Sequence, residues 1–139
     1  MGIEKEFLTW SEYGKMMIEL ANQCEPLIKE RNINYLIGVP RGGLTIAVYF
    51  SHRFHLDIID FDDFRYDARI DRSDILILDD LVDTGKTLRG LRPLKRKNDF
   101  MSAVIYKKPW ANFNPDVFIA TTENWIVFPY EDINEIPNR

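Results

Sequence analysis

Three carboxylates and a turn containing threonine, glycine and lysine occupy one short stretch of this chain, residues 75–90, which reads ILILDDLVDTGKTLRG. Asp79 and Asp80 are adjacent, Asp83 follows three residues later, and the turn Thr84–Thr87 comes directly after it. Carboxylates cannot hold phosphate, because like charges repel, but they can hold sugar hydroxyls, a magnesium ion or a developing positive charge. The turn can hold phosphate. A sugar phosphate that loses an anion requires both kinds of group at once.

The elements expected around these residues are a buried strand and the start of a helix. Ile75–Leu78 is an apolar run without polar alternation, which is typical of a strand covered on both faces in a parallel sheet. Lys86–Leu91 is expected to be helical, and a helix start offers unpaired N–H groups that attract phosphate. An ATPase loop of the form G-x-x-x-x-G-K-[ST] is excluded, because its first glycine falls on Asp80. The competing interpretation is a strand, solvated carboxylates and an ordinary turn.

The segment DDLVDTGKT resembles the phosphoribosyl pyrophosphate (PRPP) signature of the type I phosphoribosyltransferases. The resemblance implies an α/β fold with a mainly parallel, five-stranded sheet flanked by helices, completed by a small C-terminal segment that covers the base. It also implies that Asp79 and Asp80 hold the ribose hydroxyls and Mg²⁺, and that Thr84–Thr87 grips the 5′-phosphate. Asp83 would accept the N7 proton of a purine as general base.

A second strand–loop–helix unit precedes this stretch. Residues 35–39 predict a buried strand, residues 44 to about 54 predict a helix, and the loop between them reads PRGG. Arg41 can form paired hydrogen bonds with a phosphate, and the glycines, Gly42 first, allow the backbone to approach a ligand closely. A plain turn would have the same composition. The resemblance implies a pyrophosphate-binding loop here, with a cis peptide bond between Pro40 and Arg41.

The last third of the chain narrows the resemblance. A strand expected at 103–106 is followed by Lys-Lys-Pro, and the tail reads WIVFPYE from Trp125. Lysine before proline, a Trp-Ile pair and a Pro-aromatic-acid run resemble the xanthine-guanine (6-oxopurine) phosphoribosyltransferases, and the similarity covers nearly the whole chain. It implies that Lys108 donates to the purine 6-oxo group, that Trp125 stacks on the base, and that the backbone of Trp125 and Ile126 reads the base edge. A core aromatic residue is the alternative for Trp125. Val127 departs from the polar residue usual there in the bacterial enzymes and leaves the choice between xanthine and guanine open.

The remaining segments are expected to position or cover the site. Residues 9–31 predict a helix with a capping box, bent or interrupted at Pro26, and residues 56–61 and 116–120 predict two more strands. Residues 62–73 predict a charged loop or short hairpin, in the interval where the resemblance implies a mobile hood over the reacting centre. Residues 94–99 predict a basic helix end or loop. Three side chains of the hood interval either reach over pyrophosphate or form a solvated charge run: Arg65, Tyr66 and Arg69.

Composition limits the possible partners and compartments. With 139 residues the chain is long enough for one domain with a substantial core. Cys24 is the only cysteine, which excludes an internal disulfide and favours a reducing, cytoplasmic setting. The formal charge of −4 argues against broad nucleic-acid binding, and no apolar run approaches the length of a membrane span.

These observations predict a single phosphoribosyltransferase domain over residues 1–139, with about 110–139 as the purine-covering segment. The predicted reaction joins a 6-oxopurine to PRPP with Mg²⁺, giving a nucleoside monophosphate and pyrophosphate, and the resemblance implies a homo-oligomer, a dimer or tetramer. Two alternatives are a catalytically weak nucleotide-binding or regulatory protein on the same fold, and a transferase for another base, although Lys108 and Trp125 argue against adenine. The predicted site residues are Asp79, Asp80 and Asp83 for catalysis; Arg41, Gly42, Asp79, Asp80, Thr84, Gly85, Lys86 and Thr87 for PRPP; Lys108, Trp125 and Ile126 for the base; and Asp79 and Asp80 for the metal.

Overall fold

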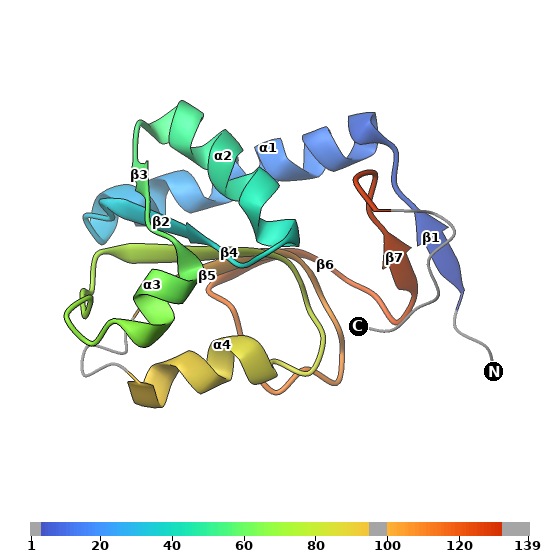
Figure 1. Cartoon of the computed structure of the whole chain (residues 1–139). Helices are drawn as coiled ribbons and strands as arrows, with labels where there is room; N and C mark the ends of the chain where they lie inside the picture. The colour runs from blue at the N-terminus through green and yellow to red at the C-terminus, as the bar shows by residue number, and fades with distance from the viewer. Residues whose placement is uncertain (1–3, 95–99, 132–139) are drawn as a thin grey trace.

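A parallel sheet lies at the centre of the computed structural model, which describes residues 4–94 and 100–131 of the chain (Figure 1). The sheet has five strands in the order β3-β2-β4-β5-β6, and every neighbouring pair is parallel. The prediction of a mainly parallel, five-stranded sheet is therefore confirmed. The basic stretch expected at 94–99 lies largely outside the described residues, as does the end of the expected purine-covering segment. The strands are β2 (Tyr35–Gly38), β3 (Asp57–Ile58), β4 (Ile75–Val82), β5 (Met101–Lys107) and β6 (Val117–Thr121).

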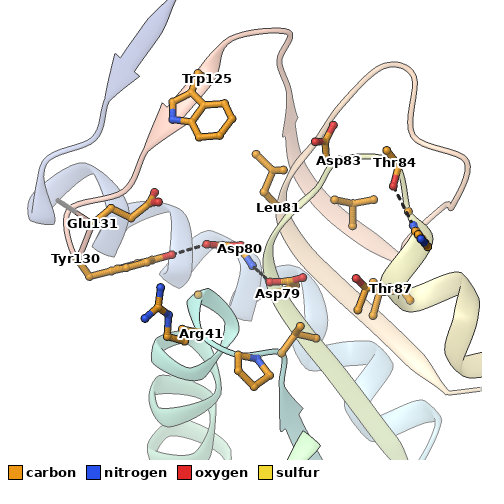
Figure 2. Close-up of a pocket in the computed structure, with 17 residues that line it drawn as sticks. Arg41, Asp79, Asp80, Leu81, Asp83, Thr84, Thr87, Trp125, Tyr130 and Glu131 are labelled. Atoms are coloured by element: carbon orange, nitrogen blue, oxygen red, sulfur yellow. Dashed lines mark hydrogen bonds between the residues drawn. The ribbon is translucent and has the colours of Figure 1, made fainter. Parts of the chain in front are cut away.

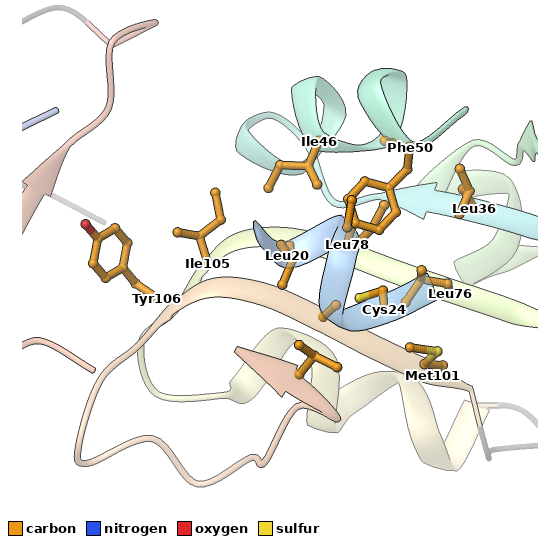
Figure 3. Close-up of a cluster of buried hydrophobic side chains, with 14 of the residues drawn as sticks. Leu20, Cys24, Leu36, Ile46, Phe50, Leu76, Leu78, Met101, Ile105 and Tyr106 are labelled. Carbon is orange, nitrogen blue, oxygen red and sulfur yellow. The ribbon is translucent and has the colours of Figure 1, made fainter. Parts of the chain in front are cut away.

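Helices cover both faces of this sheet, α1 and α2 on one face and α3 and α4 on the other (Figure 1). The alternation of side chains along β4 shows why its sequence is apolar throughout. Leu76 and Leu78 belong to the core on the α1–α2 side (Figure 3), whereas Ile75 and Ile77 belong to the core on the α3–α4 side. All four are fully buried, as expected for a central parallel strand. The helices are α1 (Trp10–Glu30), α2 (Gly42–Phe54), α3 (Phe61–Tyr66) and α4 (Lys86–Leu91), followed by a 3-10 turn at Arg92–Leu94.

Helix α1 begins with the expected capping box. The Thr9 hydroxyl accepts from the Glu12 backbone N–H at 3.0 Å, and the Glu12 carboxylate accepts from the Thr9 N–H at 2.9 Å. Pro26 was expected to bend or interrupt this helix; an interruption is wrong, because the helix runs through this residue without a break. Pro26 lies on the exposed side of α1, where water can bond the carbonyl that the missing N–H leaves without a helical partner.

The segment between β3 and β4 differs from the prediction. The strand expected at 56–61 is only two residues long, and a short helix, α3, replaces the start of the loop or hairpin expected at 62–73. Asp60 caps this helix, since its side chain accepts from the N–H groups of Asp62 and Asp63 at 3.0 and 3.1 Å. Phe61 and Phe64, one helical turn apart, are buried against the sheet. The first half of the segment that was expected to be a loop or hairpin is thus a helix that packs on the sheet.

A second, two-stranded sheet joins the two ends of the described chain. Strand β1 (Lys5–Phe7) pairs in parallel with β7 (Trp125–Val127), so that Lys5 lies opposite Trp125. The backbone N–H of Trp125 also donates to the carbonyl of Glu4 at 2.8 Å. Figure 1 shows this pair beside the end of the main sheet at which β2 and β4 terminate. Nothing in the sequence had indicated β1. Among the described helices, none combines the length and apolar character that crossing a bilayer requires.

Candidate active site

A cleft of about 980 Å³ opens at the carboxyl ends of β2 and β4 (Figure 2). Because neighbouring parallel strands end at the same edge of a sheet, the loops that follow β2 and β4 meet there. All of the residues predicted for PRPP and catalysis line this cleft, together with Trp125 from the tail. From the described part of the chain the lining comprises Val39–Gly42, Asp79–Leu88, Trp125, Tyr130 and Glu131.

Asp79 and Asp80 occupy consecutive positions near the end of β4 and differ in environment. Asp80 is buried, with 8% of its surface exposed, and its carboxylate accepts a hydrogen bond from the Tyr130 hydroxyl at 2.6 Å. The half-buried Asp79 carboxylate accepts from the Asp80 backbone N–H at 2.8 Å. The structure therefore brings the two acids together, but holds them through different partners (Figure 2).

Tyr130 is a site residue that sequence reasoning missed. Its ring stacks on Phe128 with centroids 5.6 Å apart and meets Tyr13 edge-on at 5.5 Å. Burial and the Asp80 carboxylate raise the pKa of the Tyr130 hydroxyl, so it stays a proton donor at neutral pH. The Pro-aromatic-acid run was visible in the sequence. Its pairing with Asp80 was not, because it depends on where β7 places the tail.

The glycines of the PRGG loop have a structural reason that the sequence did not reveal. A Cβ atom on Gly42 would lie 1.9 Å from a carboxylate oxygen of Asp80, and one on Gly43 would lie 2.3 Å from the carbonyl of Leu78. These glycines therefore let α2 begin directly against β4, in addition to any ligand that they admit. The peptide bond between Pro40 and Arg41 is cis, as expected, and the exposed Arg41 lines the cleft just before α2.

The loop after β4 forms the opposite wall of the cleft. Gly85 has a φ of 87°, a left-handed conformation, and a Cβ there would lie 2.6 Å from that of Phe113. The Lys86 N–H donates to the Thr84 hydroxyl at 3.2 Å, and α4 begins at Lys86. A side chain at 85 would therefore disturb the packing against Phe113 before it could reach a phosphate. The left-handed conformation and the contact with Phe113 therefore both require glycine at position 85.

A recess of about 100 Å³ shares Leu81, Asp83 and Trp125 with the main cleft. The three residues predicted for the base, Lys108, Trp125 and Ile126, all line it, and Trp125 and Ile126 belong to β7. Lys108 is only 5% exposed, and its ammonium donates to the backbone carbonyl of Asn124. Trp125 is half-buried and belongs to neither core cluster, whereas the side chain of Ile126 packs in the core and only its backbone can face a ligand. Val127 is buried and presents no polar group.

Asp83 lies where the recess meets the main cleft, and its carboxylate accepts a hydrogen bond from the indole N–H of Trp110 at 2.8 Å. Trp110 lines the recess too and was not predicted as a site residue. The available sequence signal was a tryptophan two residues after Lys108.

The side chains of the hood interval lie away from the site. Arg65, Tyr66 and Arg69 are absent from the described lining of the cleft. Arg69 forms a paired contact with Asp67, with nitrogen–oxygen distances of 3.0 and 2.9 Å, and the Arg65 guanidinium lies 5.1 Å from the centre of the Tyr66 ring. In this structure they form the solvated charge run that was one of the two expectations.

Asp79 and Asp80 are the acids best placed for a cation. Within residues 4–94 and 100–131 no group of three potential metal-ligating side chains occurs. Two neighbouring carboxylates nevertheless suit Mg²⁺, which usually keeps water and substrate phosphate oxygens among its ligands and takes only one or two carboxylates from the protein. The donor set therefore fits a metal ion that binds together with a pyrophosphate.

The sheet, the PRGG loop and the DDLVDTGKT loop together define the class, a type I phosphoribosyltransferase fold. No family model matches the sequence. The chain is 31% identical to xanthine-guanine phosphoribosyltransferase of Idiomarina loihiensis, in an alignment that spans 90% of this chain and 86% of the relative. It is 30% identical to the enzyme of the same name from Cereibacter sphaeroides, over 69% of this chain and 68% of the relative. A solved purine phosphoribosyltransferase from Pyrococcus horikoshii Ot3 matches with a TM-score of 0.76 and 31% identity, over 98% of this chain and 100% of that one. The chain belongs to the xanthine-guanine phosphoribosyltransferase family.

Proposed function

We propose that this protein transfers the 5-phosphoribosyl group of PRPP to a 6-oxopurine, releasing pyrophosphate. One observation carries the proposal. At one edge of the sheet, the two carboxylates of Asp79 and Asp80 and the loop of residues 84–87 lie beside a recess that is lined by a buried lysine, a tryptophan and Asp83. The alternative of a weak nucleotide-binding protein is not favoured, because relatives that match most of the chain are named as phosphoribosyltransferases.

PRPP would lie along the main cleft. Arg41 and the backbone at Gly42 would bind the pyrophosphate, while residues Thr84 to Thr87 would bind the 5′-phosphate from the other wall. Asp79 and Asp80 would accept from the ribose hydroxyls between these two anion sites.

The purine would enter the recess. Lys108 would donate to its 6-oxo group, and the exposed face of Trp125 would stack on its rings. In the chemical step N9 of the base bonds to C1′ of the ribose as the bond from C1′ to the pyrophosphate oxygen breaks. The N7 proton passes to Asp83, and the nearby carboxylates favour the cationic sugar of the transition state. When bound through Asp79 and Asp80, Mg²⁺ would neutralise charge on the departing pyrophosphate.

The test is pyrophosphate release from PRPP with Mg²⁺, measured separately with guanine, xanthine, hypoxanthine and adenine. Turnover is expected with at least one oxopurine and not with adenine, because a lysine donor matches a carbonyl and opposes an amino group. A double variant, Asp79→Asn with Asp80→Asn, is the matched negative control. Binding of a purine monophosphate without turnover of any base would instead support the nucleotide-binding alternative.

We also propose, from the family resemblance, that the chain forms a homo-oligomer, a dimer or tetramer, which sedimentation equilibrium would test. A cytoplasmic location stays a prediction from the single cysteine.

A further inference from the structure

Trp110 stands out among the residues around the recess, because its placement has no explanation in the core. It is 53% exposed and belongs to neither buried cluster. Its indole N–H nevertheless donates to Oδ1 of Asp83 at 2.8 Å, and its ring centre lies 5.4 Å from the Lys108 ammonium. Trp110 thus contacts two of the groups to which the proposed chemistry assigns a role.

The backbone holds Trp110 against Asp83. Trp110 lies in a tight turn in which the Ala111 N–H donates to the Lys108 carbonyl at 3.1 Å. Two further backbone bonds join this loop to the loop of Asp83, one on each side of the indole contact. The Lys108 N–H donates to the carbonyl of Val82, and the Asn112 N–H donates to the carbonyl of Thr84, both at 2.9 Å. The indole–carboxylate bond is therefore the central one of three bonds between the two loops, which distinguishes it from a chance surface contact.

We propose that Trp110 is a positioning residue: it orients the Asp83 carboxylate for proton acceptance from the purine and forms a wall of the base recess. A carboxylate at the end of a strand can otherwise rotate about its side-chain bonds. The indole donor fixes Oδ1 and leaves the other oxygen, Oδ2, available to accept a proton from a bound base. An indole nitrogen only donates, so Trp110 cannot itself take the proton. This inference rests on the proposed function, because it assumes that Asp83 is the base.

Two substitutions separate the donor from the ring. Trp110→Phe keeps an aromatic ring and removes the N–H, whereas Trp110→Gln removes the ring and places an amide N–H the same number of bonds from Cα. We expect Trp110→Phe to lower kcat with the preferred oxopurine by about 10-fold, a part of the roughly 10²–10⁴-fold that general-base catalysis contributes. The KM for PRPP should change by less than about 2-fold, and Trp110→Gln should recover most of the lost kcat.

A double-mutant cycle makes the test specific for Asp83. In an Asp83→Ala background, Trp110→Phe should have no further effect on kcat, because the group that it positions is gone. The bond can also be observed without activity, since the chain has three tryptophans and hence three indole N–H resonances. The resonance that Trp110→Phe removes should shift in Asp83→Ala, while that of Trp10 should not.

The outcomes are distinguishable. A wild-type protein that releases no pyrophosphate with any base refutes the proposed function. An active wild type whose kcat is unaltered by Trp110→Phe refutes only the role of Trp110. An equal loss of kcat in Trp110→Phe and Trp110→Gln would also refute the positioning role of Trp110. So would a loss of kcat from Trp110→Phe that adds to the loss from Asp83→Ala. Either result would indicate that Trp110 has a general packing role.

Discussion

The bond between Tyr130 and Asp80 gives the sharpest prediction of the structure. Tyr130→Phe removes one hydroxyl and retains the ring that stacks on Phe128. The lost bond is short, at 2.6 Å, and its acceptor is a carboxylate that is 8% exposed. A hydrogen bond to a charged group contributes about 1.5–3 kcal/mol, and the free energy of unfolding should fall by that amount at pH 7. For a chain of 139 residues, unfolding entropies of about 2 cal/mol/K per residue convert this to a midpoint roughly 5–10 °C lower.

Thermal and urea unfolding, followed by circular dichroism, would measure this change. Tyr66→Phe is the matched control, because Tyr66 is 71% exposed and the same substitution there should alter the free energy of unfolding by less than about 0.5 kcal/mol. A double-mutant cycle of Tyr130→Phe and Asp80→Ala should give a coupling energy as large as the stability lost in Tyr130→Phe alone. A Tyr130→Phe variant as stable as the control would show that Asp80 does not depend on this bond. The argument that Tyr130 holds the acid in place would then be wrong.

Three further predictions concern the acids and the lysine. Asp83→Asn should lower turnover by about 10²–10⁴-fold while purine monophosphate affinity, measured by calorimetry, stays within a few-fold. Lys108→Ala should lower kcat/KM for oxopurines roughly 10- to 150-fold without changing PRPP affinity, whereas loss of PRPP affinity would make Lys108 a phosphate ligand. The guanidinium of Arg72 lowers the pKa of Asp74 to about 2, with a smaller effect from Asn34. The ion pair of Arg72 and Asp74 therefore stabilises the folded state above about pH 4, and this stabilisation is lost as the pH falls through about 2. Asp74→Asn should therefore reduce the free energy of unfolding by about 1 kcal/mol at pH 7, a value discounted for solvent screening, and this effect should disappear in urea titrations as the pH falls through about 2.

The parts of the structure that the sequence predicted are those determined by neighbouring residues. The apolar run of β4 indicates burial on both faces, and the spacing of Thr9 and Glu12 is enough to place the start of α1. Helix α3 was missed although its signals were local. Asp60 as a cap and two phenylalanines three residues apart were present, but the surrounding charges were interpreted as a loop.

The undetected features of the site are contacts between distant segments. Tyr130 follows Asp80 by 50 residues, and Trp110 follows Asp83 by 27. Each contact depends on how the sheet and the β1–β7 pair place two loops, which no periodicity or spacing encodes. The reason for Gly42 was hidden in the same way, because the atom that excludes a side chain there belongs to Asp80 on another strand.

The pairing of β1 with β7 has a consequence for synthesis on the ribosome. Strand β1 is made before all five strands of the main sheet, whereas its partner β7, which contains Trp125, follows the last of them. A domain generally folds as a unit during synthesis, and here all five strands of the main sheet are present once β6 has emerged. Strand β1 must wait without its partner until β7 is released. The wall of the base recess that Trp125 supplies can therefore form only after β7 is made, later than the five-stranded sheet and the loop of residues 84–87 that follows β4.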